Sequence, residues 1–146
     1  MLLFLQAFQV GILWLHDWIP LGRLNDVRAV RAADGTMRLM LTTVVQSVPF
    51  TLCLFFTARC GLGPVPLSLR QDLLLCYGIL LTGEVRAWWW PYLVQANPFR
   101  AARYQRLFGR THAFLPHRHG IVPNTLHVVL HAATAATCAI LLAGMV

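Results

Sequence analysis

Charged side chains are scarce in this sequence of 146 residues. Only 12% of the residues are charged, whereas 58% are hydrophobic. Soluble domains carry about 25% charged residues and about 45 to 50% apolar ones, so a chain of this composition lacks the material for a water-soluble surface. The scarcity of charge argues against an ordinary soluble domain and predicts a single membrane-embedded domain over residues 1–146.

Lysine is absent altogether. The twelve basic residues are all arginine, and with five acidic residues they give a net charge of +7. A basic balance also occurs in nucleic-acid-binding proteins, which neutralise phosphates. Here the arginines lie mainly between apolar segments, which is the pattern of cytoplasmic membrane loops. We therefore expect membrane lipid as a partner and no nucleic acid.

Two familiar patterns are also missing. Residues 1–18 have neither the basic start nor the small-residue cleavage site of a secretory signal, so we expect this segment to remain as a helix. The cysteines form no C-x-x-C pair, which removes the usual signature of a zinc ribbon or a thioredoxin-like site. They are Cys53, Cys60, Cys76 and Cys138.

Four apolar stretches are long enough to cross a bilayer, for which about 20 helical residues are needed. They cover about residues 2–19, 39–58, 73–94 and 122–145, and proline or glycine lies near the breaks between them. The sequence therefore predicts an all-α fold, an integral membrane four-helix bundle.

Arginine is distributed unequally over the loops between these spans. The first loop has four arginines, the third has five and the second has two. Basic loops stay in the cytoplasm. We expect a protein integral to the cell membrane, with the first and third loops cytoplasmic and both termini outside.

The third loop contains a helix signal of its own. Asn97 followed by Pro98 is typical of an N-cap and a first helical position, and Gly109 is typical of a helix end. Arginines recur every three or four positions from residue 100 to residue 110, which predicts a short amphipathic interfacial helix on the anionic inner leaflet. A basic loop that only sets the topology is the alternative interpretation. These are Arg100, Arg103, Arg106 and Arg110.

Ionisable residues inside an apolar span are costly and usually face a partner or a cavity. Glu84 lies in the third predicted span, and His127 and His131 lie one turn apart in the fourth. Imidazole and carboxylate are ligands of zinc and non-haem iron. The spacing suggests a metal site made by Glu84, His127 and His131, with hydrogen-bonded contacts between helices as the alternative.

His16 and Asp17 lie near the cytoplasmic end of the first predicted span. His16 is a candidate fourth ligand, and Asp17 is placed to orient a ligating ring. With Glu84, these two residues are the candidate catalytic groups.

The segment before the fourth span is rich in cationic side chains, which suits a phosphate or carboxylate headgroup. A solvated loop is the alternative interpretation. The candidate headgroup-binding residues are Arg110, His112, His117, Arg118 and His119.

Three functions are compatible with these residues. The leading hypothesis is a membrane-embedded, metal-dependent enzyme with zinc or iron, acting on a lipid-soluble or amphiphilic substrate near the cytoplasmic leaflet. The second is a small proton- or ion-coupled transporter with Glu84 in the relay, which would need to form a homo-oligomer. The third is a non-catalytic accessory subunit of a larger membrane complex.

Overall fold

The computed structural model describes residues 1–61 and 63–145, and this part of the chain is helical and contains no strand. The all-α prediction is therefore confirmed. The elements are α1 (Leu2–Leu15), the 3-10 turn η1 (Gly22–Leu24), α2 (Val27–Asp34), α3 (Thr36–Arg59), α4 (Leu67–Glu84), the π-helical η2 (Val85–Trp89), α5 (Trp90–Leu93), α6 (Pro98–Phe108) and α7 (Thr125–Ala143).

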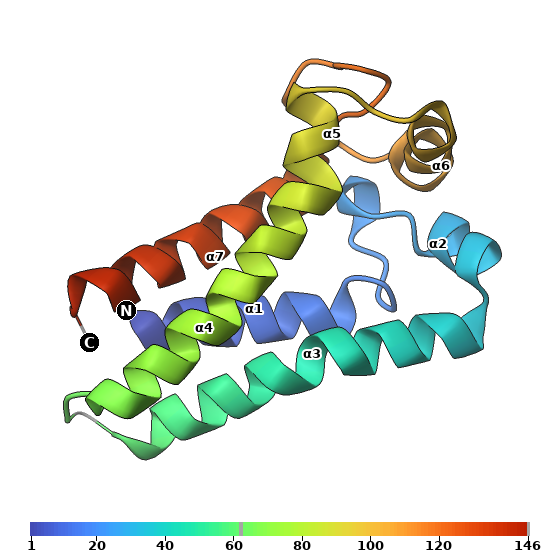
Figure 1. Ribbon diagram of the computed structural model, residues 1–146. Helices are drawn as coiled ribbons and strands as arrows, with labels where there is room; N and C mark the ends of the chain where they lie inside the picture. Colours follow the sequence, from blue (N-terminus) through green and yellow to red (C-terminus); the bar gives the residue numbers. More distant parts are fainter. Residues whose placement is uncertain (62, 146) are drawn as a thin grey trace.

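The helices α1, α3, α4 and α7 form the body of the molecule (Figure 1). Helix α1 packs against α3 and α7, and α4 packs mainly against α7. Both termini lie at the end where α3 finishes and α4 begins, whereas α2 and α6 lie at the other end (Figure 1). The first and third loops therefore meet at one end of the molecule.

Within residues 1–61 and 63–145, two helices are long and apolar enough to cross a membrane. They are α3, with 24 residues, and α7, with 19 residues. Helix α1 has 14 residues, which at a rise of about 1.5 Å per residue is about 21 Å, short of a hydrocarbon core of about 30 Å. By length and composition, the predicted four-span bundle is thus not confirmed.

The first predicted span ends earlier than expected. Helix α1 stops at Leu15, and residues 16–19 form a turn. The amide nitrogen of Asn25 donates to the backbone carbonyls of His16 and Ile19, which satisfies oxygens that a continuing helix would have used. The apolar residues of this segment give no signal for the turn, because the residue that stabilises it, Asn25, lies in the following loop.

The third predicted span is longer than expected. It begins at Leu67, because Pro66 occupies the N-cap position, rather than near residue 73. It then passes from α4 through the π-helical η2 into α5. Short π-helical segments of this kind frequently lie at functional sites.

The loop helix predicted after Asn97 is confirmed. The side-chain oxygen of Asn97 accepts from the backbone nitrogen of Phe99 at 2.9 Å, Pro98 begins α6 and Gly109 caps it. Helix α2 in the first loop was not predicted. The Asp26 carboxylate accepts from Ala29 N at 3.0 Å at its start.

Two clusters of buried side chains hold these helices together. The smaller cluster joins α2, α3 and α6 through Val30, Leu39 and Leu107, with Trp18 and Phe108 packed against it. It fixes the two loop helices over one end of the body. The larger cluster lies among α1, α3, α4 and α7 and consists of Leu2, Leu13, Phe50, Leu73, Tyr77, Leu130, Cys138 and Leu141.

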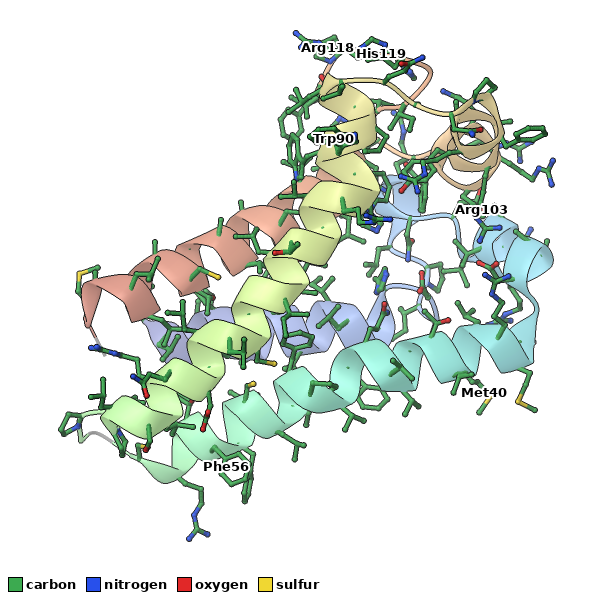
Figure 2. The ribbon with its side chains drawn as sticks, viewed as in Figure 1. Met40, Phe56, Trp90, Arg103, Arg118 and His119 are labelled. Atoms are coloured by element: carbon green, nitrogen blue, oxygen red, sulfur yellow. The ribbon has the colours of Figure 1, made fainter. Side chains whose placement is uncertain are left out.

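The outer face of α3 is apolar and exposed. Figure 2 shows Met40 and Phe56 pointing away from the body of the molecule near the two ends of this helix. Only 22% of the apolar stretch of α3 is buried. Contiguous apolar surface of this extent is rare on soluble monomers and marks contact with a membrane or a partner. The exposed residues of α3 include Met37, Met40, Leu41, Val44, Val45, Leu52, Phe55 and Phe56.

Candidate functional site

Two adjoining cavities share one wall. The first, the apolar cavity, has a volume of about 550 Å³ and lies between α3 and α4. The second, the polar cavity, has a volume of about 430 Å³ and is lined by residues of the loop helices α2 and α6 and of α3. We call the residues that line both cavities the shared wall. They are His16, Gln46, Ala87, Trp88 and His127.

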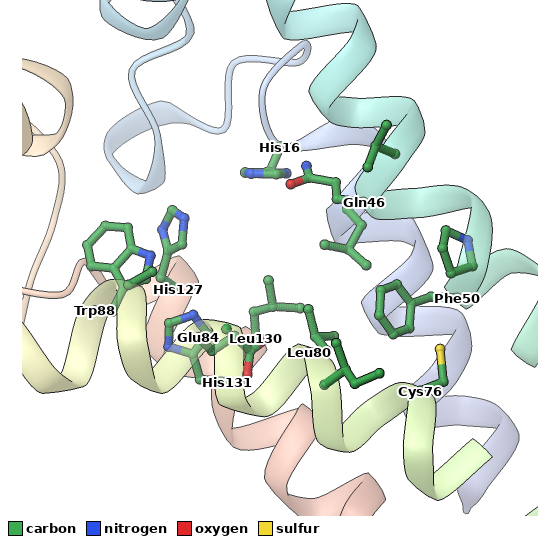
Figure 3. Close-up of a pocket in the computed structure, with 16 residues that line it drawn as sticks. His16, Gln46, Phe50, Cys76, Leu80, Glu84, Trp88, His127, Leu130 and His131 are labelled. Atoms are coloured by element: carbon green, nitrogen blue, oxygen red, sulfur yellow. The ribbon is translucent and has the colours of Figure 1, made fainter. Parts of the chain in front are cut away.

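The apolar cavity is closed at one end by aliphatic and aromatic side chains. Phe50 of α3 and Leu80 of α4 lie at this end, next to Cys76 (Figure 3). Trp88 and His127 lie at the opposite end (Figure 3). The cavity therefore changes from apolar to polar along its length.

His127 is held in one orientation by the start of α7. Its Nδ1 lies 2.7 Å from the side-chain oxygen of Asn124, which also accepts the backbone nitrogen of His127 at 2.9 Å. An amide oxygen only accepts, so Nδ1 carries the hydrogen and Nε2 keeps a lone pair. The ring centroid lies 4.2 Å from that of Trp88. His127 thus offers a fixed proton acceptor at the shared wall.

His16 lies on the other side of this wall. Its Nδ1 is 2.8 Å from the carbonyl of Ile12, and its Nε2 is 3.4 Å from a carboxylate oxygen of Asp17. The rings of His16 and His127 are 5.8 Å apart at their centroids. Asp17 follows the end of α1. Its pKa is raised, because the effect of burial exceeds the opposing effect of His16. The wall therefore joins a histidine–carboxylate pair to a second histidine.

The polar cavity carries a balanced pair of charges. Arg103 Nη2 lies 2.7 Å and 2.9 Å from the two carboxylate oxygens of Asp34. Arg103 is therefore directed towards Asp34. Its spacing in the sequence had instead predicted contact with the anionic inner leaflet. Tyr104 of the same helix donates to the carbonyl of Ala87. Burial raises the pKa of Tyr104, so this hydroxyl keeps its hydrogen.

Glu84 belongs to a hydrogen-bonded network between α1, α4 and α7. Thr134 Oγ1 lies 2.9 Å from Glu84 Oε1, 3.0 Å from the side-chain oxygen of Gln9 and 3.1 Å from the carbonyl of Leu130. Gln9 in turn donates to Thr137 Oγ1 at 2.9 Å. The network therefore ties the three helices together.

One hydroxyl hydrogen cannot serve three acceptors. Among the partners of Thr134, only the Glu84 carboxyl can carry a hydrogen of its own. The second carboxyl oxygen, Oε2, is buried with no hydrogen-bond partner in the described residues, a costly position for an ionised group. Both observations are satisfied if Glu84 is protonated and donates to Thr134.

His131 is also turned towards a protein partner. Its Nδ1 lies 3.0 Å from the indole nitrogen of Trp89. An indole N–H only donates, so Nδ1 accepts and the hydrogen of the neutral ring is on Nε2. Neither nitrogen then offers a free lone pair, although Glu84 and His131 both line the apolar cavity.

No group of three or more His, Cys, Asp or Glu side chains is placed to hold a metal ion in residues 1–61 and 63–145. The predicted site at Glu84, His127 and His131 is thus not supported. The two histidine rings do lie 5.9 Å apart, as their spacing implies. Their hydrogen bonds, and that of Glu84, are made to three different partners.

The residues predicted to bind a headgroup lie elsewhere. Figure 2 shows Arg118 and His119 beyond α5, at the end of the molecule. The guanidinium of Arg118 lies 5.6 Å from the centre of the Tyr92 ring, and His112 pairs with Thr125 Oγ1 at 2.7 Å. In the described part of the chain, neither cavity is lined by Arg110, His112, His117, Arg118 or His119.

Other residues that form or fix the shared wall were not predicted as site residues. Gln46 and Trp88 belong to the shared wall, and Asn124 fixes the ring of His127. The position of Asn124 directly before an apolar helix is an N-cap signal. Nothing in the run Trp88, Trp89 and Trp90 distinguishes its buried member from its exposed one.

These features define a helical protein with a cavity that is apolar at one end and polar at the other. Comparisons of the chain with protein-family models, curated proteins and solved structures find no match.

Proposed function

We propose that this chain is an integral membrane protein that binds a lipid-soluble or amphiphilic molecule near the cytoplasmic leaflet. The observation that supports this function best is the shared wall between the apolar and the polar cavity. Ligand pockets are mostly apolar with a few placed polar groups. An apolar tail fits between α3 and α4, and a polar head fits beside His16 and His127.

Three observations support placement in a membrane. Helices α3 and α7 are long and apolar enough to span it, α3 exposes apolar side chains along its length, and the arginines cluster in the first and third loops. The proposed spans are α1, α3, the continuous helix from α4 to α5, and α7, in one domain. The basic loops are cytoplasmic and both termini lie outside.

Thiol labelling of intact cells tests this topology. In a cysteine-free background, Gly63→Cys should react with an impermeant reagent, whereas Ala101→Cys should react only after the cells are opened. The arginine count places these two positions on opposite sides of the membrane. Labelling of Ala101→Cys alone in intact cells would contradict the topology.

The apolar cavity has a route to the bilayer. Val45 of α3 and Ile79 of α4 line it, yet they are 64% and 66% exposed. Side chains that belong both to the cavity and to the outer surface mark a lateral opening between the two helices. A lipid-soluble molecule can enter there without passing through water.

Acid–base catalysis is the more specific candidate function. The observation that favours it is the fixed ring of His127, whose Nδ1 is bonded to Asn124. General acid–base catalysis uses a histidine oriented in this way. We propose that His127 Nε2 removes a proton from the bound molecule and that the pair of His16 and Asp17 delivers a proton to it.

The transporter hypothesis receives less support from the geometry. The polar network of Glu84 continues through Gln9 to Thr137, whose hydroxyl donates to the carbonyl of Ala133 at 2.9 Å. A backbone carbonyl accepts a hydrogen but cannot pass a proton on. This network suits the joining of helices better than proton conduction.

Filling the apolar cavity tests the proposed binding. Gly83 lines it, and a Cβ added there meets no atom within 4 Å. We expect Gly83→Leu to weaken binding of a fluorescent fatty-acid probe to the detergent-purified protein by about tenfold, a change of roughly 1.4 kcal/mol. Gly78→Leu on the same helix is the control, since Gly78 is equally unobstructed and lies outside the cavity. Unchanged probe binding in Gly83→Leu would contradict the proposal.

A further inference from the structure

A pocket outside both cavities lies where η2 meets α6. Its volume is about 530 Å³, and it shares none of its lining residues with the two cavities. Two of these residues are arginines from different helices. The lining residues are Thr82, Val85, Arg86, Trp90 and Arg100.

The two arginines leave a positive charge without a counter-ion. Arg100 Nη1 donates to the backbone carbonyl of Arg86 at 3.4 Å, which holds the two residues together. The carboxylate of Asp34, which contacts α6 at Arg103, is already paired with Arg38 and Arg103. Within residues 1–61 and 63–145, no salt bridge involves Arg86 or Arg100. The pocket is therefore suited to an anion.

Exposed aromatic residues accompany the two arginines, one in the pocket lining and one next to Arg100 in the sequence. Trp90 is 61% exposed, and Phe99, which precedes Arg100, is 88% exposed. Figure 2 shows Trp90 on the helix between the body and the loop helices. Exposed aromatic rings next to arginines are typical of the zone where lipid headgroups meet acyl chains.

An apolar groove continues from the pocket along α4. The groove has a volume of about 310 Å³ and shares Thr82 with the arginine pocket. Gly78 lies in the groove, and the space beside its Cα is open. The other lining residues are Leu74, Leu75 and Ile79. Cationic pocket and apolar groove thus form one surface.

We propose that this surface binds a single anionic phospholipid. The phosphate would lie between the guanidinium groups of Arg86 and Arg100, where planar N–H donors match phosphate oxygens. The acyl chain would follow the groove past Gly78. The arginine pocket shares no lining residue with the central cavities, whereas the groove meets the apolar cavity at Ile79. The proposal rests on the proposed placement in a membrane.

Native mass spectrometry of the full chain in a neutral detergent tests the site, with phosphatidylglycerol, phosphatidylcholine and inorganic phosphate as probes. Phosphatidylglycerol should bind more tightly than phosphatidylcholine. The variant Arg86→Gln/Arg100→Gln should weaken phosphatidylglycerol binding by about 25-fold, because each basic side chain at an anionic lipid surface contributes about fivefold. Arg86→Lys/Arg100→Lys should retain part of this affinity, since it keeps the charge but loses the planar donors.

Two matched variants separate a site from general charge attraction. Arg106→Gln/Arg110→Gln removes the same charge from exposed positions outside the pocket and should leave phosphatidylglycerol binding unchanged. Gly78→Leu should weaken phosphatidylglycerol binding while it leaves the fatty-acid probe in the central cavity unaffected.

Equal losses in the two double glutamine variants would overturn the proposal in favour of diffuse attraction. Displacement of phosphatidylglycerol by an equal concentration of inorganic phosphate would overturn it in favour of a free-anion site. Recovery of the unmodified chain in the soluble fraction of cells would instead contradict the membrane placement. Failure of the lipid site and failure of the proposed function are therefore distinguishable.

Discussion

Two polar regions lie among the apolar helices, and they differ in what their hydrogen bonds leave free. In the network of Gln9, Glu84 and Thr134, the bonds run from helix to helix. At the shared wall, the bond between His127 and Asn124 leaves Nε2 without a hydrogen, next to two cavities. Polarity inside an apolar helix is therefore not enough to identify a site. An unpaired atom beside open space is the better criterion, because the unpaired oxygen of Glu84, Oε2, is buried.

The largest effect should follow from breaking the network. Thr134→Val keeps the side-chain volume but removes the hydroxyl that Gln9 and Glu84 share. We expect the free energy of unfolding in bicelles to fall by about 1 to 3 kcal/mol, the usual cost of a buried polar group left unpaired. Thr82→Val is the control, since its hydroxyl bonds only to Gly78 of its own helix. Equal stability of the two variants would show that the network does not hold the helices.

A change at the shared wall should affect binding more than stability. His127→Leu removes the acceptor at the junction of the cavities, and we expect fatty-acid probe affinity to fall by about tenfold, or roughly 1.4 kcal/mol. His117→Leu, outside both cavities, should bind as the unmodified protein does. Loss of stability in His127→Leu without loss of affinity would place His127 among the structural residues.

Substitution of Glu84 should have a small effect on stability, although the sequence pattern suggested that Glu84 is a metal ligand. Glu84→Gln keeps a donor that can replace a protonated carboxyl towards Thr134. The free energy of unfolding should therefore change by less than about 1 kcal/mol, within the net contribution of one hydrogen bond. A loss of several kcal/mol would mean that the side chain is ionised and that its charge has a role.

Metal removal should have the smallest effect. Zinc or iron at Glu84, His127 and His131 would require the bonds to Thr134 and Trp89 to break. We expect a chelator to leave both the unfolding free energy and the probe affinity unchanged. Stoichiometric zinc or iron that is lost in Glu84→Gln would restore the metal-dependent enzyme as the leading hypothesis.

Local signals in the sequence account for much of the helical structure. The Asn97 cap predicts α6, and long apolar runs predict α3 and α7. Helix α2 was missed because its eight residues carry no apolar run; it is held by Val30 against Leu107 of α6. Contacts between distant segments leave no such pattern.

In the candidate site too, the sequence did not reveal which distant residues contact one another. The spacing of His127 and His131 places both rings on one face of α7, but it does not reveal that one ring meets Asn124 and the other Trp89. The pairing of Arg86 with Arg100 likewise depends on how α6 folds back over η2. The residue types were predictable, whereas their partners were not.

Photolabelling with two diazirine fatty acids tests whether one bound molecule extends from the shared wall into the apolar cavity. One carries the diazirine next to the carboxyl group and the other carries it at the end of the chain. We expect the first to label the shared wall, at Trp88 or His127, and the second to label the apolar end, at Phe50 or Cys76. Label confined to the outer face of α3, or found at the same residues with both probes, would contradict binding across the two cavities.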